Sequence, residues 1–283
     1  MNVAALLVTA AGDLAAAGVA SPRFDAEALL AHVLGVAPPH ARGARTLTAE
    51  QQAAFAILVR RRAAREPLQH LVGSVGFRHV EIAVGPGVFI PRPETEVLAG
   101  WAIDQLAAAR ALGQAEPVAV DLCTGSGAVA ATLADEAPYA RVHAVELSPD
   151  AVRYAARNLS GTGVDLRQGD IADALDDLDG CVDVVVANPP YIPLTAYESV
   201  DIETRRHDPA LALWSGADGL AMIRTVERVA HRLLRSGGVV GCEHADVQGQ
   251  SAPSIFRGSG RWGDVRVHQD LAERPRFVTA RRV

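Results

Sequence analysis

The chain has 283 residues, of which 49% are hydrophobic, and it carries a formal net charge of −6. This length suffices to bury a large core, and the negative charge argues against a broad nucleic-acid-binding surface. The sequence has no run of about 20 uncharged apolar residues and no basic residue in positions 1–12, so neither a membrane span nor a secretory signal is expected. Its three cysteines and nine histidines show no metal-ligand spacing. We expect a soluble, cytoplasmic protein without a bound metal.

Residues 1–70 are predicted to form a small helical domain. Three helices fit the pattern: one over residues 3–17, one that Ser21 caps and Gly35 ends, and one that begins with a capping box of Thr48 and Gln51. This segment contains no reactive cluster. We therefore expect it to grip a protein substrate, and the alternative is that it only stabilises the domain that follows.

Residues 71–92 are predicted to link the domains through a short β-hairpin. The strands would cover residues 72–77 and 80–84, and a Gly-Pro-Gly turn follows at residues 85–87. A helix then begins near residue 94. Arg92, Thr95 and Glu96 rank below the motif residues as site candidates, because an arginine after a turn is usually a surface residue. The remaining residues, 93–283, would form the second domain.

A strand, a glycine-containing loop and a helix follow one another from residue 117 to residue 134. The strand 117–122 leads into the loop Cys123-Thr124-Gly125-Ser126-Gly127. Glycines allow a ligand to approach the backbone, and the helix start offers N–H groups to it. A second strand, 141–145, ends in Glu146, at the usual offset of about 20 residues for a carboxylate that binds ribose hydroxyls. The sequence therefore predicts a ribose-containing ligand.

Two ligands compete for this loop. The run from Gly125 to Ala130 fits the dinucleotide pattern G-x-G-x-x-G/A, which keeps a nicotinamide oxidoreductase as a rival. Asp121 favours S-adenosylmethionine instead, because its carboxylate would repel a pyrophosphate and can hold an ammonium group. Asp170 and Ile171, after a short strand around residues 164–167, are predicted to meet the adenine with one acceptor and one apolar side chain.

The most informative segment is Asn188-Pro189-Pro190-Tyr191, which directly follows the apolar strand 182–187. An amide or aromatic amine is a poor nucleophile, so an enzyme that alkylates it must orient both of its N–H bonds. The Asn188 side-chain oxygen and the Pro189 carbonyl can accept these bonds, and the proline pair holds them rigidly. Tyr191 offers a flat face to the planar group. A simple proline-rich turn is the competing interpretation.

From residue 118 onward, strands alternate with helices, as in a doubly wound, mostly parallel sheet that binds its ligand at the carboxyl ends of the strands. The site residues all follow strand ends, so we expect them to meet at one edge. Strands near 239–242 and 276–280 are predicted to pair in antiparallel fashion. Convergence of these groups is the strongest support that the residues alone provide.

These motifs resemble, in their order, those of class I S-adenosylmethionine methyltransferases that act on amide or exocyclic amino nitrogens. Nearly the whole chain resembles the HemK/PrmC family. The further matching blocks are residues 65–73, Phe77, residues 89–96, 207–213, 216–219 and 237–238, Glu243 and Gln248. Two departures are visible: Cys123 stands where the family usually has glycine, and residues 272–276 lack the usual glycine-containing ending.

The resemblance implies a Rossmann-like, mostly parallel seven-stranded sheet with an N-terminal helical domain. It implies S-adenosylmethionine as methyl donor, S-adenosylhomocysteine as product, and methylation of N5 of the glutamine in the Gly-Gly-Gln motif of peptide chain release factors, in support of translation termination. The implied catalytic residues are Asn188, Pro189, Pro190 and Tyr191. The implied cofactor-binding residues are Asp121, Cys123, Thr124, Gly125, Ser126, Gly127, Glu146, Asp170, Ile171 and Asn188.

Two other functions stand beside this one. A methyltransferase acting on adenine or guanine in nucleic acid would use the same Asn-Pro-Pro-Tyr logic but needs a basic groove, which the charge disfavours. A non-catalytic adaptor that senses a nucleotide would have no use for an amide clamp. We expect a monomer, because the sequence shows no heptad pattern.

Overall fold

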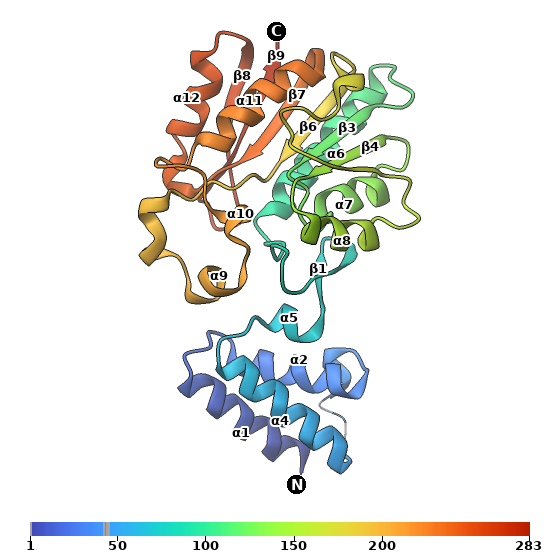
Figure 1. The fold of residues 1–283 in the computed structure, drawn as a ribbon. Coiled ribbons are helices and arrows are strands. Elements are labelled where there is room, and N and C mark those ends of the chain that lie inside the picture. Colours follow the sequence, from blue (N-terminus) through green and yellow to red (C-terminus); the bar gives the residue numbers. More distant parts are fainter. Residues whose placement is uncertain (1, 42, 44–45) are drawn as a thin grey trace. The chain divides into compact units, whose positions relative to one another are not determined.

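The structure is a computed structural model that describes residues 2–41, 43 and 46–283 (Figure 1). The chain forms two compact units. One comprises the residues up to Ser74 together with Asp201–His207, and the other comprises Val75–Val200 and Asp208–Val283. A short segment from late in the sequence therefore belongs to the N-terminal unit.

The N-terminal unit is helical and has its own core of buried leucine, valine and phenylalanine side chains. Its helices are α1 (Val3–Ala16), α2 (Pro22–Leu34), α3 (Pro38–Ala41), α4 (Ala49–Ala63), α5 (Leu68–Val72) and α9 (Ile202–His207). The capping box at the start of α4 is confirmed: Gln51 N donates to Thr48 Oγ1 and Thr48 N donates to Gln51 Oε1, at 3.2 and 3.0 Å. Gly35 ends α2 in a left-handed conformation, as predicted.

Ser21 occupies the N-cap position of α2 and Pro22 its first turn, as predicted, but the Ser21 side chain makes no capping hydrogen bond. Its ψ of 59° departs from the extended value of 165° at Thr48, where the side chain does cap. Ser21 contributes only its carbonyl, which accepts from Asp25 N at 2.9 Å.

Helix α9 is held to the N-terminal unit by buried charges. The Arg62 guanidinium donates to Asp25 Oδ2 at 2.7 Å and to Glu203 Oε1 at 2.9 Å, and its side chain is 7% exposed. Arg65 Nε also lies 2.7 Å from Glu203 Oε1. Each buried charge is thus paired, which is the condition under which burying it is tolerated.

The second unit contains a seven-stranded sheet in the order β5-β4-β3-β6-β7-β9-β8, as the resemblance implied. Its strands are β3 (Val118–Leu122), β4 (Arg141–Glu146), β5 (Asp165–Gln168), β6 (Val182–Ala187), β7 (Leu234–Glu243), β8 (Trp262–Gln269) and β9 (Pro275–Arg282). The first five are parallel, and β9 is antiparallel to both β7 and β8. The predicted antiparallel pairing of β7 with β9 is confirmed, whereas β8 was not predicted.

Helices cover both faces of this sheet (Figure 1). The helices of this unit are α6 (Thr95–Ala111), α7 (Ala128–Glu136), α8 (Pro149–Asn158), α10 (Ala210–Leu213), α11 (Ala221–Leu233) and α12 (Ser251–Gly258). Alternate strand residues point to opposite faces: Ala119 packs with α6, α7 and α8, and Val120 packs with α11 and α12. Every residue of β6 is buried, as expected of a central strand.

A two-stranded hairpin, β1 (Ser74–Phe77) and β2 (Val80–Ala83), packs into the core beside α7 and α8 through Phe77 and Ile82. Among the described residues, no helix combines the length and the apolar character that crossing a bilayer would require.

The strand register brings three chain segments to one edge of the sheet. Leu122 at the end of β3 pairs with Val145 of β4 on one side and with Ala187 of β6 on the other. From β3 the chain proceeds outward through β4 and β5, whereas β6 begins the opposite half. The ends of β3 and β6 therefore form a topological switch point, where sheets of this type bind ligands.

Candidate functional site

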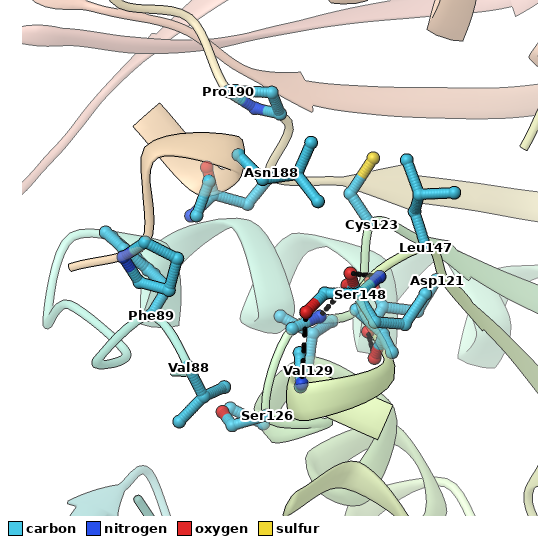
Figure 2. Close-up of a pocket in the computed structure, with 18 of the residues that line it drawn as sticks. Val88, Phe89, Asp121, Cys123, Ser126, Val129, Leu147, Ser148, Asn188 and Pro190 are labelled. Atoms are coloured by element: carbon cyan, nitrogen blue, oxygen red, sulfur yellow. Dashed lines mark hydrogen bonds between the residues drawn. The ribbon is translucent and has the colours of Figure 1, made fainter. Parts of the chain in front are cut away.

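A pocket of about 970 Å³, open to solvent, lies at this switch point (Figure 2). Three carboxylates line it, those of Asp121, Glu146 and Asp170, together with the Asn188 amide and many apolar side chains. No arginine, lysine or histidine occurs among the lining residues. Its charge therefore suits a ligand with positive charge and disfavours a pyrophosphate.

The loop after β3 depends on left-handed backbone conformations. The φ values are 60° at Cys123, 58° at Gly125 and 82° at Gly127. Glycine adopts this region freely, whereas a side chain makes it unfavourable. Glycine would therefore suit the position of Cys123. The cysteine adopts the same left-handed conformation, but at an energetic cost. Cys123, Thr124, Gly125 and Ser126 all line the pocket.

Gly127 does not line the pocket, although it was predicted with the cofactor-binding residues. It stands at the start of α7, and a Cβ there would come within 3.2 Å of Leu159 and 3.4 Å of the Ala155 backbone. Gly127 therefore allows α7 to pack closely against α8, and it supports the loop without lining the pocket.

Asp121 lines the pocket and is 2% exposed. Its Oδ2 accepts from Thr124 Oγ1 at 2.5 Å and from Ala130 N, in the first turn of α7, at 3.2 Å. Its Oδ1 makes no hydrogen bond to the described residues. Burial raises the pKa of Asp121 to about 7, because the charged form is deprived of water.

Glu146 and Asp170 line the pocket after β4 and β5. Glu146 accepts from Gly125 N and Ser148 N, both at 2.8 Å, so it ties the glycine loop to the neighbouring strand. Asp170 is exposed and accepts from Ala172 N at 2.9 Å, and Ile171 beside it is buried. These positions are compatible with the predicted contacts to ribose and adenine.

Asn188 lines the pocket directly after β6, at the end of the strand next to that of Asp121 (Figure 2). Its Nδ2 donates to Thr95 Oγ1 at 3.0 Å, and Thr95 Oγ1 donates to Glu243 Oε2 at 2.8 Å. The Tyr191 hydroxyl donates to Glu243 Oε1 at 3.1 Å. Burial raises the pKa of Glu243 to about 7 and also raises that of Tyr191.

Thr95 is a weak candidate in the sequence and Glu243 has no predicted role, although both contact the Asn-Pro-Pro-Tyr segment. The only sequence signal for either was its place in the blocks shared with the HemK/PrmC family. Pro190 lines the pocket, whereas Pro189 and Tyr191 do not. Pro189 is buried, and the Tyr191 backbone carbonyl accepts from Gln248 Nε2 at 2.9 Å.

The outer part of the pocket is apolar. Phe89, Pro209 and Leu211 line it, and Leu211 is 51% exposed. Arg92 pairs with Asp208 at 2.7 Å, and its guanidinium carbon lies 5.1 Å from the centre of the Phe89 ring. Arg92 thus neutralises an acid beside the pocket and joins the two segments that form this rim.

Two protein families match separate parts of the chain. The family described as PrmC N-terminal domain matches residues 5–73, and the family described as Methyltransferase domain matches residues 119–205. A release factor glutamine methyltransferase from Streptomyces coelicolor is 58% identical over 271 residues, which cover 95% of this chain and 94% of the relative. The chain belongs to this methyltransferase family. The predicted fold class, enzyme class and family are thereby confirmed.

A second relative has a different name. The 4-amino-L-phenylalanine/4-methylamino-L-phenylalanine methyltransferase of Streptomyces pristinaespiralis is 45% identical, over 92% of this chain and 89% of its own. Among solved structures, the hMettl16 catalytic domain in complex with MAT2A 3′UTR hairpin 6 matches with a TM-score of 0.53 and 15% identity, over 70% of this chain and 74% of that one. This last likeness bears on the fold alone.

Proposed function

We propose that this protein transfers the methyl group of S-adenosylmethionine to N5 of the glutamine in the Gly-Gly-Gln motif of peptide chain release factors. The observation that carries the proposal is the Asn188 side chain, which reaches the pocket with Nδ2 bound to Thr95 and with Oδ1 making no hydrogen bond to the described residues. An acceptor held in this way suits an N–H donor. The name of the 58% identical relative supports glutamine as that donor.

The residues of the pocket fit S-adenosylmethionine better than a dinucleotide. Asp121 would hold the ammonium group through Oδ1, Glu146 would accept from the ribose hydroxyls, and Asp170 and Ile171 would meet the adenine. A dinucleotide would bring two negative phosphates to a pocket lined by these carboxylates and by no basic side chain. This charge argument weighs against the nicotinamide oxidoreductase.

The chemistry asks little of the protein beyond placement. The bound donor supplies a methyl group that its sulfonium already activates. Asn188 Oδ1 and the Pro189 carbonyl would orient the two N–H bonds of the glutamine amide, and the apolar rim would exclude water. Tyr191, which does not line the pocket, would hold the Asn-Pro-Pro-Tyr segment in place through its hydrogen bond to Glu243. Methylation makes the nitrogen acidic, so its proton can leave without a dedicated histidine or glutamate base.

We propose that the N-terminal helical unit grips the release factor. Its separate core and its match to the PrmC N-terminal domain support this role. We further propose that the enzyme acts as a monomer and without direct contact to nucleic acid.

A methyl-transfer assay with several acceptors tests the proposal. Labelled S-adenosylmethionine would be offered with unmethylated release factor, with the same factor lacking the Gly-Gly-Gln glutamine, with RNA or DNA, and with free 4-aminophenylalanine. The aromatic amine is included because of the 45% identical relative. Label on the intact release factor alone is expected. Transfer to nucleic acid or to the aromatic amine in its place would overturn the substrate assignment, and transfer to none would favour a sensor.

A further inference from the structure

We propose that Thr95 and Glu243 are positioning residues that fix which atom of the Asn188 amide faces the substrate, and that they thereby make the site select glutamine over glutamate. The inference rests on the proposed function and deepens it. It concerns how the site recognises the group to be methylated.

The hydrogen bonds run in one direction. Glu243, at the end of β7, is 1% exposed and in its ionised form offers only acceptors. One carboxylate oxygen of Glu243 accepts a hydrogen bond from Thr95 Oγ1, and the other accepts one from the Tyr191 hydroxyl. Burial raises the pKa of Glu243 to about 7, and Arg276 on the neighbouring strand β9 opposes that shift, so Glu243 is ionised above about pH 7. In the ionised form, Glu243 accepts both hydroxyl hydrogens.

This commitment decides the orientation of Asn188. Thr95, the first residue of α6, is 4% exposed, and its single hydroxyl hydrogen is used on Glu243. Its oxygen can then only accept, so it selects the Asn188 amide nitrogen, which lies 3.0 Å away. Turning the amide over would place two oxygens against each other with no hydrogen between them, an arrangement that buried groups avoid.

The consequence is chemical selectivity. With Nδ2 bound to Thr95, Asn188 presents only Oδ1 to the pocket, and an acceptor favours a glutamine amide, which donates N–H. A glutamate carboxylate offers only acceptors near neutral pH and would be repelled. Without the Thr95 hydroxyl, the Asn188 amide can rotate and present its nitrogen, which suits a carboxylate. The Thr95 hydroxyl therefore controls discrimination between two side chains of nearly the same shape.

The test compares Thr95→Val, which removes the hydroxyl at similar volume, with Thr95→Ser, which keeps it. At pH 8, above the pKa of Glu243 of about 7, two quantities would be measured: kcat/KM for unmethylated release factor, and the inhibition constant of a release factor whose Gly-Gly-Gln glutamine is replaced by glutamate. The serine variant is the matched control. Affinity for S-adenosylmethionine would be measured in parallel.

Thr95→Val is expected to lower kcat/KM by about 10- to 100-fold, the effect of losing one or two buried hydrogen bonds. It should also lower the ratio of the glutamate-form inhibition constant to KM by about tenfold, while affinity for S-adenosylmethionine stays within about threefold. Thr95→Ser should behave like the wild type. A simple folding defect would not change the ratio. If Thr95→Val fails to fold, Thr95→Ala gives the same comparison.

Unchanged discrimination in a folded Thr95→Val or Thr95→Ala variant would overturn the inference, as would a serine variant as impaired as the valine one. Either outcome leaves the proposed function standing if the wild type still methylates the release factor. Absence of methylation by the wild type would instead refute the proposed function itself.

Discussion

Replacing Asp121 with asparagine should stabilise the unliganded protein at alkaline pH and weaken its binding of S-adenosylmethionine. Burial raises the pKa of Asp121 from 3.8 to about 7, so ionising it in the folded state is unfavourable. A shift of about 3 units corresponds to about 4 kcal/mol. Because the folded-state pKa is raised, the stabilising contribution of this group is complete below about pH 4 and is lost as pH rises through about 7.

The asparagine variant would not titrate in this range. Both protein hydrogen bonds of Asp121 reach Oδ2, so the asparagine oxygen can take that place, with its amide nitrogen toward the pocket. The variant should therefore exceed the wild type by about 1 to 2 kcal/mol at pH 5, where part of the contribution is already lost, and by about 4 kcal/mol at pH 8. Loss of the charge opposite the ligand ammonium should weaken binding at least about 30-fold, which corresponds to about 2 kcal/mol.

Urea-induced unfolding followed by tryptophan fluorescence measures the stability difference, because Trp101, Trp214 and Trp262 all lie in the second unit, which contains the sheet and Asp121. Calorimetric titration with S-adenosylmethionine measures the affinity. Asp170→Asn is the matched control, since Asp170 lines the same pocket but is exposed. An equal effect of Asp121→Asn at pH 5 and pH 8, or unchanged affinity, would refute the reasoning.

Three further substitutions test other parts of the site. Asn188→Ala should lower methyl transfer at least about 100-fold and leave affinity for S-adenosylmethionine within about threefold; equal loss of both in kinetics and calorimetry would place Asn188 in cofactor binding. Cys123→Gly should raise the urea-unfolding free energy by about 1 kcal/mol, because it relieves a φ of 60°, and a decrease would contradict that account. Gly127→Val should lower the urea-unfolding free energy by about 2 to 3 kcal/mol and weaken cofactor binding through the clash with Leu159. Normal stability and a normal calorimetric titration with S-adenosylmethionine would show that this packing is unimportant.

The edge of the sheet that carries the site could be predicted because its markers are local in the sequence. Asp121, Glu146 and Asn188 each stand at or just after the end of an apolar strand, and the ends of parallel strands meet at one edge. The sequence also indicated that the glycines of the loop after β3 let a ligand approach the backbone. The different role of Gly127 could not be predicted, because only the packing of α7 on α8 reveals that Gly127 faces Leu159.

The contacts that orient Asn188 lie beyond what a sequence pattern reports. Thr95 and Glu243 are 148 residues apart, and a threonine at a helix start predicts only a cap. Strand β8 was missed for a related reason: it lies at the edge of the sheet, and most of its side chains are polar or exposed, so no apolar run marks it. Likewise, nothing local indicated that Glu203 would pair with Arg62 in the N-terminal unit.

The most direct test of the central claim is to map the methyl group by mass spectrometry after incubation of the wild-type enzyme with S-adenosylmethionine and unmethylated release factor. The account predicts one added methyl group, on the side-chain amide of the Gly-Gly-Gln glutamine, and none when Asn188→Ala replaces the wild type. A methyl group on any other residue, or full methylation by the Asn188→Ala variant, would contradict it.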